Sequence, residues 1–494
     1  MKRINGRTIA YLSVFLVVIA RSTFAVTIQA LPAEPLHYSV ADLHEDVNFV
    51  SRSLTQIHFS LGDETWAANI KSQAEQIKNS VKAPLTQAEF YVVIAPLITA
   101  MRDGHTSIPF PFRDIDNYAA SGGKIFPLDV THIQDGLFVL SDISSGQKIP
   151  LGARLLAIND VPIEKILTQM QSLLSGDRAE YRLAQLDGIN DRFKVLLWML
   201  YGSCDEYAIR YNINGEAREG KVSALTREQV RAERKKHNPP KFEPYEFQLL
   251  EPGVAELKIR SFVVDQKVFE KFLQASFKKI EQSNISRLII DVRGNLGGDL
   301  DLATGLLSYV ATEPVAIIAR TELRVSQQAK ADFALKIPTA LRWLPVQYLD
   351  SKGREVWGAA EGSLVSFSEK PGNKKQGAAS AAGLRFTGKV IVLVDAISTS
   401  AAEYFADAVQ RNKLGTVIGQ AAGNAPNIWY GEPLLVKMPY TELGFTVSRM
   451  AFYPPAIESI STPGHLVPDF SVARNLADEL ARQDTILSFA LKQP

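Results

Sequence analysis

Cysteine is the scarcest residue of this chain, because Cys204 stands alone among 494 residues. A single cysteine excludes an intrachain disulfide, and its neighbours in YGSCDEY provide no group that would activate it as a nucleophile. An excess of one charge is also missing, since 54 basic residues face 53 acidic ones and leave a formal net charge of +1. Overall electrostatics therefore indicate no nucleic-acid partner and no acidic membrane surface.

Long apolar runs are missing beyond the N-terminus. There, three basic residues precede an apolar stretch at 9–20, and small residues follow up to Ala25. A basic start, a short apolar middle and a small-residue cleavage position are typical of a secretory signal peptide. We therefore expect residues 1–25 to be removed, and the mature protein to be periplasmic or extracellular without a stable membrane span. An uncleaved membrane anchor is the alternative, although the stretch is short for a span.

Motifs for metals and nucleotides are missing too. No cluster of His, Cys, Asp or Glu has the spacing of a metal site, and neither the Walker pattern nor G-x-G-x-x-G occurs. The sequence therefore predicts no metal and no cofactor. Three histidines near the N-terminus, His37, His44 and His58, are expected to be surface or interface residues.

The periodic patterns that are present predict several parts. Apolar residues recur with helical spacing in the segment 34–110, and strand-like runs with a helical insertion occupy 121–222. A basic, proline-containing linker at 223–245 follows. Strands then alternate with helices over 246–494, which indicates an α/β layer with a largely parallel sheet. Within this last part we expect a strand at PVAIIAR and a mobile loop, a candidate lid, at 361–383.

Two apolar strands of the α/β part end in sharp turns. LIIDVRGNLGGDLD places Gly297 and Gly298 after a strand, where backbone N–H groups can approach a ligand; a plain glycine turn is the alternative. VIVLVDAISTSAAEYF places Ser400 between a strand and a helix, without the G-x-S-x-G signature. Ser400 and Glu403 have capping-box spacing. The sequence thus leaves Ser400 two roles, helix cap or nucleophile at a helix N-terminus.

A nucleophilic serine requires a base, and seven histidines make a short list. His105 lies in MRDGHTSIPF, on a glycine-containing turn that follows a helical pattern. Its small polar neighbours predict an accessible side chain. An exposed loop histidine without a catalytic role is the alternative.

Taken together, DVRGNLGG, the later ISTSAAEYFADAVQ and the V-P-D at 467–469 resemble the C-terminal processing, or tail-specific, protease family. The resemblance covers nearly the whole mature chain. It implies a ClpP/crotonase-like α/β core, an N-terminal helical segment and a β-rich PDZ-like module, whose core stretch resembles residues 150–167. One branch of the family carries a catalytic lysine in a turn that here reads IGQAAGNAPN, without lysine. The chain is therefore similar to the His-dependent branch with the tricorn core, whose histidine motif resembles D-G-H-T at 103–106.

This resemblance implies roles for single residues. Ser400 is the expected nucleophile and His105 its base. Glu458 is the expected carboxylate that orients the histidine, with Glu432 and Glu442 as alternatives.

The resemblance also implies an oxyanion hole, made by backbone N–H groups of Gly297 or Gly298 together with that of Ala401. The function it implies is that of an exported serine endopeptidase that cleaves unfolded or extended protein segments through an acyl-enzyme. The alternative is an inactive peptide- or lipid-binding protein on the same fold. Retention of the serine, the histidine and both glycines favours the enzyme.

Overall fold

The computed structural model describes residues 35–62, 64–146, 148–187, 191–236, 242–335, 351–368, 383–424, 428–455 and 466–493. The expected signal peptide, Glu458 and most of the expected loop at 361–383 lie outside these residues. No helix within the described ranges is both long and apolar enough to cross a membrane.

The chain divides into two compact units. The first, which we call the Ser400 unit, comprises Glu243–Ile317 and Lys370–Val417 in its described parts. The second, the His105 unit, comprises the described parts of Thr27–Phe242, Ile318–Glu369 and Ile418–Pro494. The segment 246–494, which we expect to form the α/β core, therefore contributes to both units.

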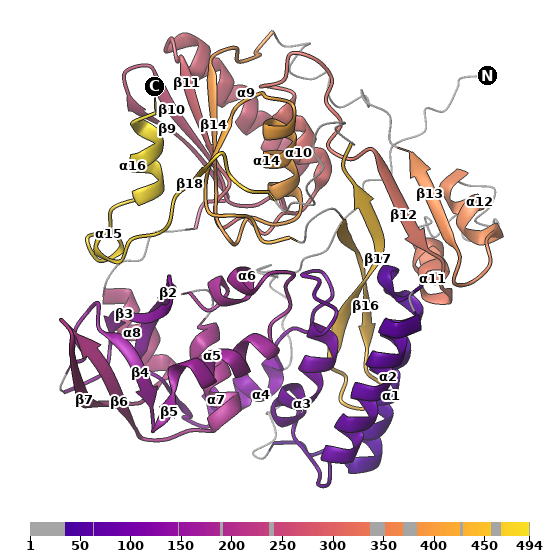
Figure 1. The fold of residues 1–494 in the computed structure, drawn as a ribbon, viewed down its shortest axis with the longest axis vertical. Coiled ribbons are helices and arrows are strands. Elements are labelled where there is room, and N and C mark those ends of the chain that lie inside the picture. Colours follow the sequence, from indigo (N-terminus) through magenta and orange to yellow (C-terminus); the bar gives the residue numbers. More distant parts are fainter. Residues whose placement is uncertain are drawn as a thin grey trace, which may run out of the picture. The chain divides into compact units, whose positions relative to one another are not determined.

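The Ser400 unit is built on a mostly parallel sheet (Figure 1). Its strands β9 (Tyr245–Glu251), β10 (Val254–Ile259), β11 (Arg287–Asp291) and β14 (Lys389–Val394) are neighbours in this order. β10, β11 and β14 run parallel, and β9 is antiparallel at the edge. β11 and β14 are buried along nearly their whole length, as strands covered on both faces are. The predicted α/β layer with a largely parallel sheet is confirmed.

Three helices follow strands of this sheet. They are α9 (Gln266–Gln282), α10 (Leu300–Leu307) and α14 (Ala401–Arg411), and α10 contacts both of the others. Because α10 comes after β11 and α14 after β14, both helices begin at the carboxyl ends of neighbouring parallel strands. These ends meet at one edge of the sheet, which places the two candidate turns side by side.

Helices begin the His105 unit. α1 (Val40–Ile57), α2 (Glu64–Ser80) and α3 (Gln87–Thr99) contact one another. The apolar residues that α1 buries recur at spacings of three and four: Leu43, Val47, Val50, Leu54 and Ile57. α3 begins at a capping box between Thr86 and Glu89. The helical pattern expected for 34–110 is confirmed.

A four-stranded antiparallel sheet follows in the same unit, in the order β13–β12–β17–β16 (Figure 1). Its strands are β12 (Arg320–Arg324), β13 (Leu364–Ser368), β16 (Trp429–Lys437) and β17 (Gly444–Tyr453). β17 contacts α1. This strand later anchors the loop that carries His105.

One expectation for this region is wrong, and a second is corrected over the part that the structure describes. PVAIIAR is not a strand, because β12 begins only at Arg320. Ile317 and Ile318 are both buried without strand pairing, so the apolar run reflects burial alone. The expected loop at 361–383 contains β13, because Phe367 packs with Leu323 and Val325 in a small apolar cluster.

A six-stranded antiparallel sheet lies in the remaining part of the His105 unit, in the order β2–β3–β4–β6–β7, with the short β5 (Val161–Pro162) paired to β4 beside this path. Its strands are β2 (Leu128–Ile133), β3 (Gly136–Asp142), β4 (Arg154–Ile158), β6 (Glu206–Ile213) and β7 (Glu216–Ser223). The accompanying helices are α5 (Ile163–Ser172), α6 (Ala179–Ala184) and α7 (Arg192–Tyr201). Strands with a helical insertion at 121–222 are thus confirmed, whereas the PDZ-like description stays a prediction.

The remaining elements are short or peripheral. They are η1 (Phe59–Gly62), α4 (Phe112–Ala120), β1 (Lys124–Ile125), β5 (Val161–Pro162), β8 (Leu225–Thr226), α8 (Arg227–Lys236), α11 (Gln327–Leu335), α12 (Ser351–Gly358), β15 (Thr416–Gly419), β18 (Phe470–Ser471), α15 (Leu476–Leu480) and α16 (Thr485–Leu491). α8 occupies part of the expected linker at 223–245.

Candidate active site

Ser400 lies where the chain turns from β14 into α14, in a strained conformation. Its backbone has φ 53° and ψ −131°, a combination that non-glycine residues rarely adopt. Its side chain makes no capping hydrogen bond to the helix. Of the two roles that the sequence leaves open, the helix cap is therefore excluded. A strained turn from strand to helix is the setting in which hydrolases expose a nucleophilic serine.

Side-chain and backbone hydrogen bonds hold this turn. Asp395 Oδ1 accepts the N–H groups of Ile397 and Ser398 at 3.1 and 2.9 Å. The Asp395 carboxylate also accepts the N–H of Gly294, at 3.0 Å. Ser398 Oγ donates to the carbonyl of Val292, at 2.9 Å. The loops after β11 and β14 are thus linked to each other, and the shape of the Ser400 turn depends on both.

The paired glycines pack directly against this turn. Gly297 has φ 92°, and a Cβ there would lie 2.5 Å from Ser400 Cβ and 2.9 Å from the Thr399 carbonyl oxygen. Gly298 has φ 134°, and a Cβ there would lie 2.4 Å from the backbone of Phe262. Neither position can carry a side chain without moving its neighbours. The glycines therefore permit a close backbone approach to the serine.

Asn295 forms a hydrogen bond with one N–H group of the glycine turn, so this group is not available to a ligand. Its buried side chain accepts the N–H of Gly297 at 2.8 Å and donates to the carbonyl of Ile259 at 3.0 Å. The Gly297 N–H is therefore already engaged. In the described parts of the chain, no hydrogen bond occupies the N–H of Gly298 or of Ala401. Two of the three predicted oxyanion-hole positions thus keep a free donor.

His105 lies in the other unit, on the loop that follows α3. It is only 8% exposed, so the expectation of an accessible side chain is wrong. The reason is a short antiparallel pairing of the loop with β17. Ser107 and Thr446 exchange two backbone hydrogen bonds of 3.2 and 2.7 Å, and Thr446 Oγ1 donates to the His105 carbonyl at 2.8 Å.

Asp103 contacts His105 and is itself almost fully buried. Its Oδ1 accepts the backbone N–H of His105 at 2.9 Å and lies 3.6 Å from His105 Nδ1. Burial by itself raises the pKa of the Asp103 carboxyl, but hydrogen bonds from His105 and His58, together with the charge of His105, hold it well below its usual range. Burial by itself lowers the pKa of His105, but the Asp103 carboxylate close to its ring outweighs this effect and raises it.

His58 completes this cluster, although we expect it at the surface or at an interface. It is fully buried, its Nε2 lies 3.2 Å from Asp103 Oδ2, and its ring packs on Tyr430 at 5.1 Å between centroids. No sequence signal indicates this position, because the two partners are 45 residues apart. Only the end of α1 and the turn after α3 bring them together.

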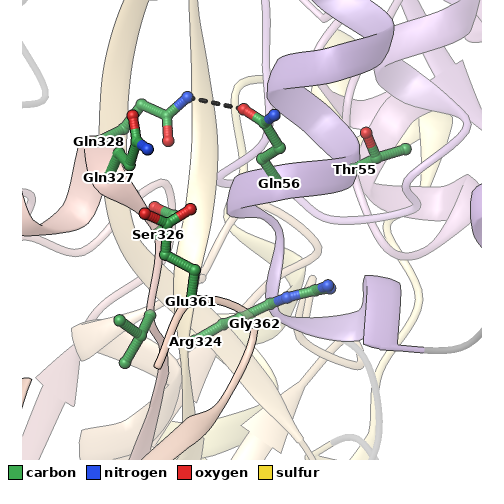
Figure 2. Close-up of a pocket in the computed structure, with 9 residues that line it drawn as sticks. Thr55, Gln56, Arg324, Ser326, Gln327, Gln328, Glu361 and Gly362 are labelled. Atoms are coloured by element: carbon green, nitrogen blue, oxygen red, sulfur yellow. Dashed lines mark hydrogen bonds between the residues drawn. The ribbon is translucent and has the colours of Figure 1, made fainter. Parts of the chain in front are cut away.

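A cavity of about 300 Å³ lies in the His105 unit (Figure 2). Figure 2 shows mainly polar side chains around it, from the end of α1, from the end of β12 and the residues after it, and from the residues before β13. Arg324 lines the cavity and donates from Nη1 to the carbonyl of His58 at 3.2 Å. Burial lowers the pKa of this guanidinium. The contact helps to hold the end of α1 that carries His58.

The acidic residues considered as partners of His105 differ in position. Glu432 pairs with the buried Arg449 at 3.4 Å, and its charge contributes to the raised pKa of His105. Glu442 is largely exposed and lies 3.3 Å from Lys437 near the tip of the β16–β17 hairpin. Glu458 lies outside the described residues.

A strained serine at a helix N-terminus, with free N–H donors beside it, is an arrangement typical of hydrolases that use a serine nucleophile. Residues 253–472 match the model of peptidase family S41. This segment is thus an S41 domain, and the protein is a serine-type peptidase, as the motifs predict. The resemblance to the processing proteases is thereby confirmed. Among curated proteins, none matches the chain.

Solved structures of mature CPAF share the fold of this chain. Mature CPAF complexed with lactacystin is 14% identical in sequence to this chain, with a TM-score of 0.58. The alignment covers 90% of this chain and 96% of the CPAF chain. Mature CPAF alone has 14% identity and a TM-score of 0.57, with coverage of 89% and 94%. The photosystem II D1 C-terminal processing protease has 13% identity and a TM-score of 0.39, with coverage of 87% and 92%.

Proposed function

We propose that this protein is an exported serine endopeptidase that cleaves extended protein segments through an acyl-enzyme on Ser400. The observation that carries the proposal is the strained, uncapped Ser400 at the N-terminus of α14, beside the free N–H groups of Gly298 and Ala401. A serine placed there has no structural task that we can identify. The strain of such a conformation, roughly 1–3 kcal/mol, is typical of a functional site.

The proposed reaction is acyl transfer in two halves. His105 takes the proton of Ser400 Oγ, which attacks the peptide carbonyl, and the imidazolium then protonates the leaving amine. The oxyanion of the tetrahedral intermediate accepts hydrogen bonds from Gly298 and Ala401, and the N-terminus of α14 adds a favourable dipole. Water, deprotonated by His105, then hydrolyses the ester. Glu458 is our proposal for a carboxylate that stabilises the imidazolium.

The antiparallel sheet β2–β7 is our proposal for a substrate-holding module. A PDZ-like sheet binds an extended peptide as an additional strand, so that main-chain hydrogen bonds supply affinity and side-chain pockets supply specificity. This role fits a peptidase whose substrates are unfolded or extended.

Labelling with a fluorophosphonate tests the proposal directly. The mature chain, residues 34–494, is treated with the reagent and digested, and the modified peptide is identified by mass spectrometry. We expect the label on Ser400 and, in parallel, cleavage of an unfolded protein substrate. Heat-denatured chain is the control and should not react. A folded chain that neither reacts nor cleaves would favour the binding-protein alternative.

The raised pKa of His105 predicts the pH dependence of cleavage. A general base must be neutral, so kcat/KM should be maximal above the raised pKa and fall about tenfold per pH unit below it. The midpoint should lie above the ordinary histidine value of about 6.5. Protonated His105 also stabilises the fold; this contribution is complete below the unfolded pKa and is lost as pH rises through the raised pKa.

A pH–rate profile and urea unfolding measured at the same pH values check both statements. An acid limb with a midpoint below pH 6 would contradict the environment described for His105.

A further inference from the structure

We propose that Asp103 is the carboxylate that orients His105, and that His58 and Thr106 hold Asp103 in place for this task. The inference rests on the proposed function, because it takes His105 as the catalytic base. In this inference Asp103 replaces Glu458 as the carboxylate that contacts Nδ1 of His105 and stabilises the imidazolium. Asp103 and His58 are positioning residues here, since they act through His105.

The first support is that both oxygens of Asp103 are committed. Oδ1 faces His105 through the backbone N–H and through Nδ1, as described above. Oδ2 accepts the Thr106 hydroxyl at 2.6 Å and faces His58 Nε2 at 3.2 Å. A carboxylate held by donors on each oxygen cannot rotate freely. It therefore holds a negative charge in a fixed position 3.6 Å from Nδ1 of the His105 ring.

The second support is that the tautomer of His58 is determined. The backbone N–H of Ser60 donates to His58 Nδ1 at 3.2 Å, and a backbone N–H can only donate. Nδ1 of His58 must therefore be without a proton, and the ring proton lies on Nε2. This proton points at Asp103 Oδ2. His58 thus donates to Asp103 from Nε2, while the packed Tyr430 ring restricts its movement.

The third support is the pattern of the turn itself. Asp103 accepts the N–H two residues later and the hydroxyl three residues later, which closes an Asx-type turn around Gly104. Ser448 donates its N–H to Thr106 Oγ1 at 3.0 Å and so links the turn to β17. The order D-G-H-T therefore brings the histidine and its carboxylate together locally.

The fourth support comes from electrostatics. Asp103 is 2% exposed, and a buried carboxylate is costly unless opposite charge or hydrogen bonds compensate it. Its compensation comes from His105, His58 and Thr106. A charged Asp103 beside Nδ1 favours the imidazolium that forms when His105 accepts the serine proton. Glu432, by contrast, has Arg449 as its partner.

The test compares Asp103→Asn with a matched buried carboxylate in the same unit. Asp46 is also fully buried and accepts the N–H groups of Tyr440 and Thr441 and the Thr441 hydroxyl, and none of these hydrogen bonds involves the D-G-H-T turn. Asp46→Asn therefore controls for the loss of a buried charge. Each variant is measured in the mature chain, by kcat/KM on an unfolded protein and by NMR titration of ¹⁵N/¹³C-labelled histidines. The titrations use the Ser400→Ala background to prevent self-cleavage.

We expect Asp103→Asn to lower kcat/KM by a factor on the order of 10² to 10⁴ and to move the His105 titration to lower pH. The His105 signal is identified by its loss in His105→Gln. Asp46→Asn should leave both quantities close to those of the parent. An unchanged His105 titration in Asp103→Asn, with kcat/KM within about threefold of the parent, overturns the inference.

A second pair of variants keeps the test decisive should Asp103→Asn fail to fold. His58→Gln retains an N–H donor for Asp103 Oδ2, whereas His58→Leu removes it. A gap of at least about tenfold in kcat/KM between the two, with glutamine the more active, supports the inference. Equal activities overturn the role of His58.

The two readouts also separate this inference from the proposed function. If neither the parent nor any variant cleaves peptides, but the His105 titration still moves in Asp103→Asn, the orienting contact stands and the peptidase proposal fails. If the parent cleaves peptides but the His105 titration does not move in Asp103→Asn, the peptidase proposal stands and the orienting role of Asp103 fails.

Discussion

Ser400→Ala is expected to lower kcat/KM for a protein substrate by a factor on the order of 10⁴ to 10⁶, because the nucleophile is removed and only substrate binding and the oxyanion hole remain. Folding should hardly change, since Ser400 makes no capping bond that alanine would lose. The measurement is single-substrate kinetics beside urea unfolding of the same samples. A Ser400→Ala protein with full activity would remove Ser400 from the mechanism.

Ser400→Gly tests the strained backbone conformation of this residue. The φ of 53° and ψ of −131° suit glycine far better than serine. Relief of the strain should exceed the extra entropy that glycine loses on folding, so we expect a gain of about 1 kcal/mol in the free energy of unfolding. The variant should be as inactive as Ser400→Ala. Loss of stability in Ser400→Gly would contradict the strained geometry.

Gly297→Ala is the second large effect that we expect. A methyl group at this position meets Ser400 Cβ at 2.5 Å and the amide nitrogen of Ala401 at 3.0 Å, and the φ of 92° is itself unfavourable for alanine. Displacement of the turn should cost about 2–4 kcal/mol and lower kcat/KM by at least roughly a hundredfold, since it moves the nucleophile and a proposed oxyanion donor together. Kinetics and the midpoint of urea unfolding measure both.

Gly305→Ala provides the matched control. Gly305 lies within α10, and a Cβ there has open space around it. Alanine in a helix interior should stabilise the fold by about 0.5–1 kcal/mol without changing activity. If Gly297→Ala behaves like Gly305→Ala, the close packing of the glycine turn against Ser400 is wrong.

Local pattern predicted most of the secondary structure, and its failures have a common cause. The helix spacing that predicts α1 is confirmed, as is the strand run that becomes β14. PVAIIAR failed because apolar residues are buried in irregular segments as readily as in strands. β13 was missed because the apolar cluster that covers Phe367 comes from distant parts of the chain.

The sequence by itself determined which residues could take part in the chemistry. Ser400, the paired glycines and the D-G-H-T turn are recognisable because each depends on a few adjacent residues and on backbone conformations that few side chains allow. The S41 match confirms the class of enzyme that these motifs predict.

Only the tertiary structure determined the burial and the hydrogen-bond partners of these residues. Whether Ser400 caps its helix, and whether His105 is buried, could not be inferred from neighbouring residues. His58 contacts Asp103 across 45 residues, and Ser107 pairs with Thr446 across 339. Such contacts depend on how whole elements pack, and packing sets burial, hydrogen-bond partners and therefore pKa.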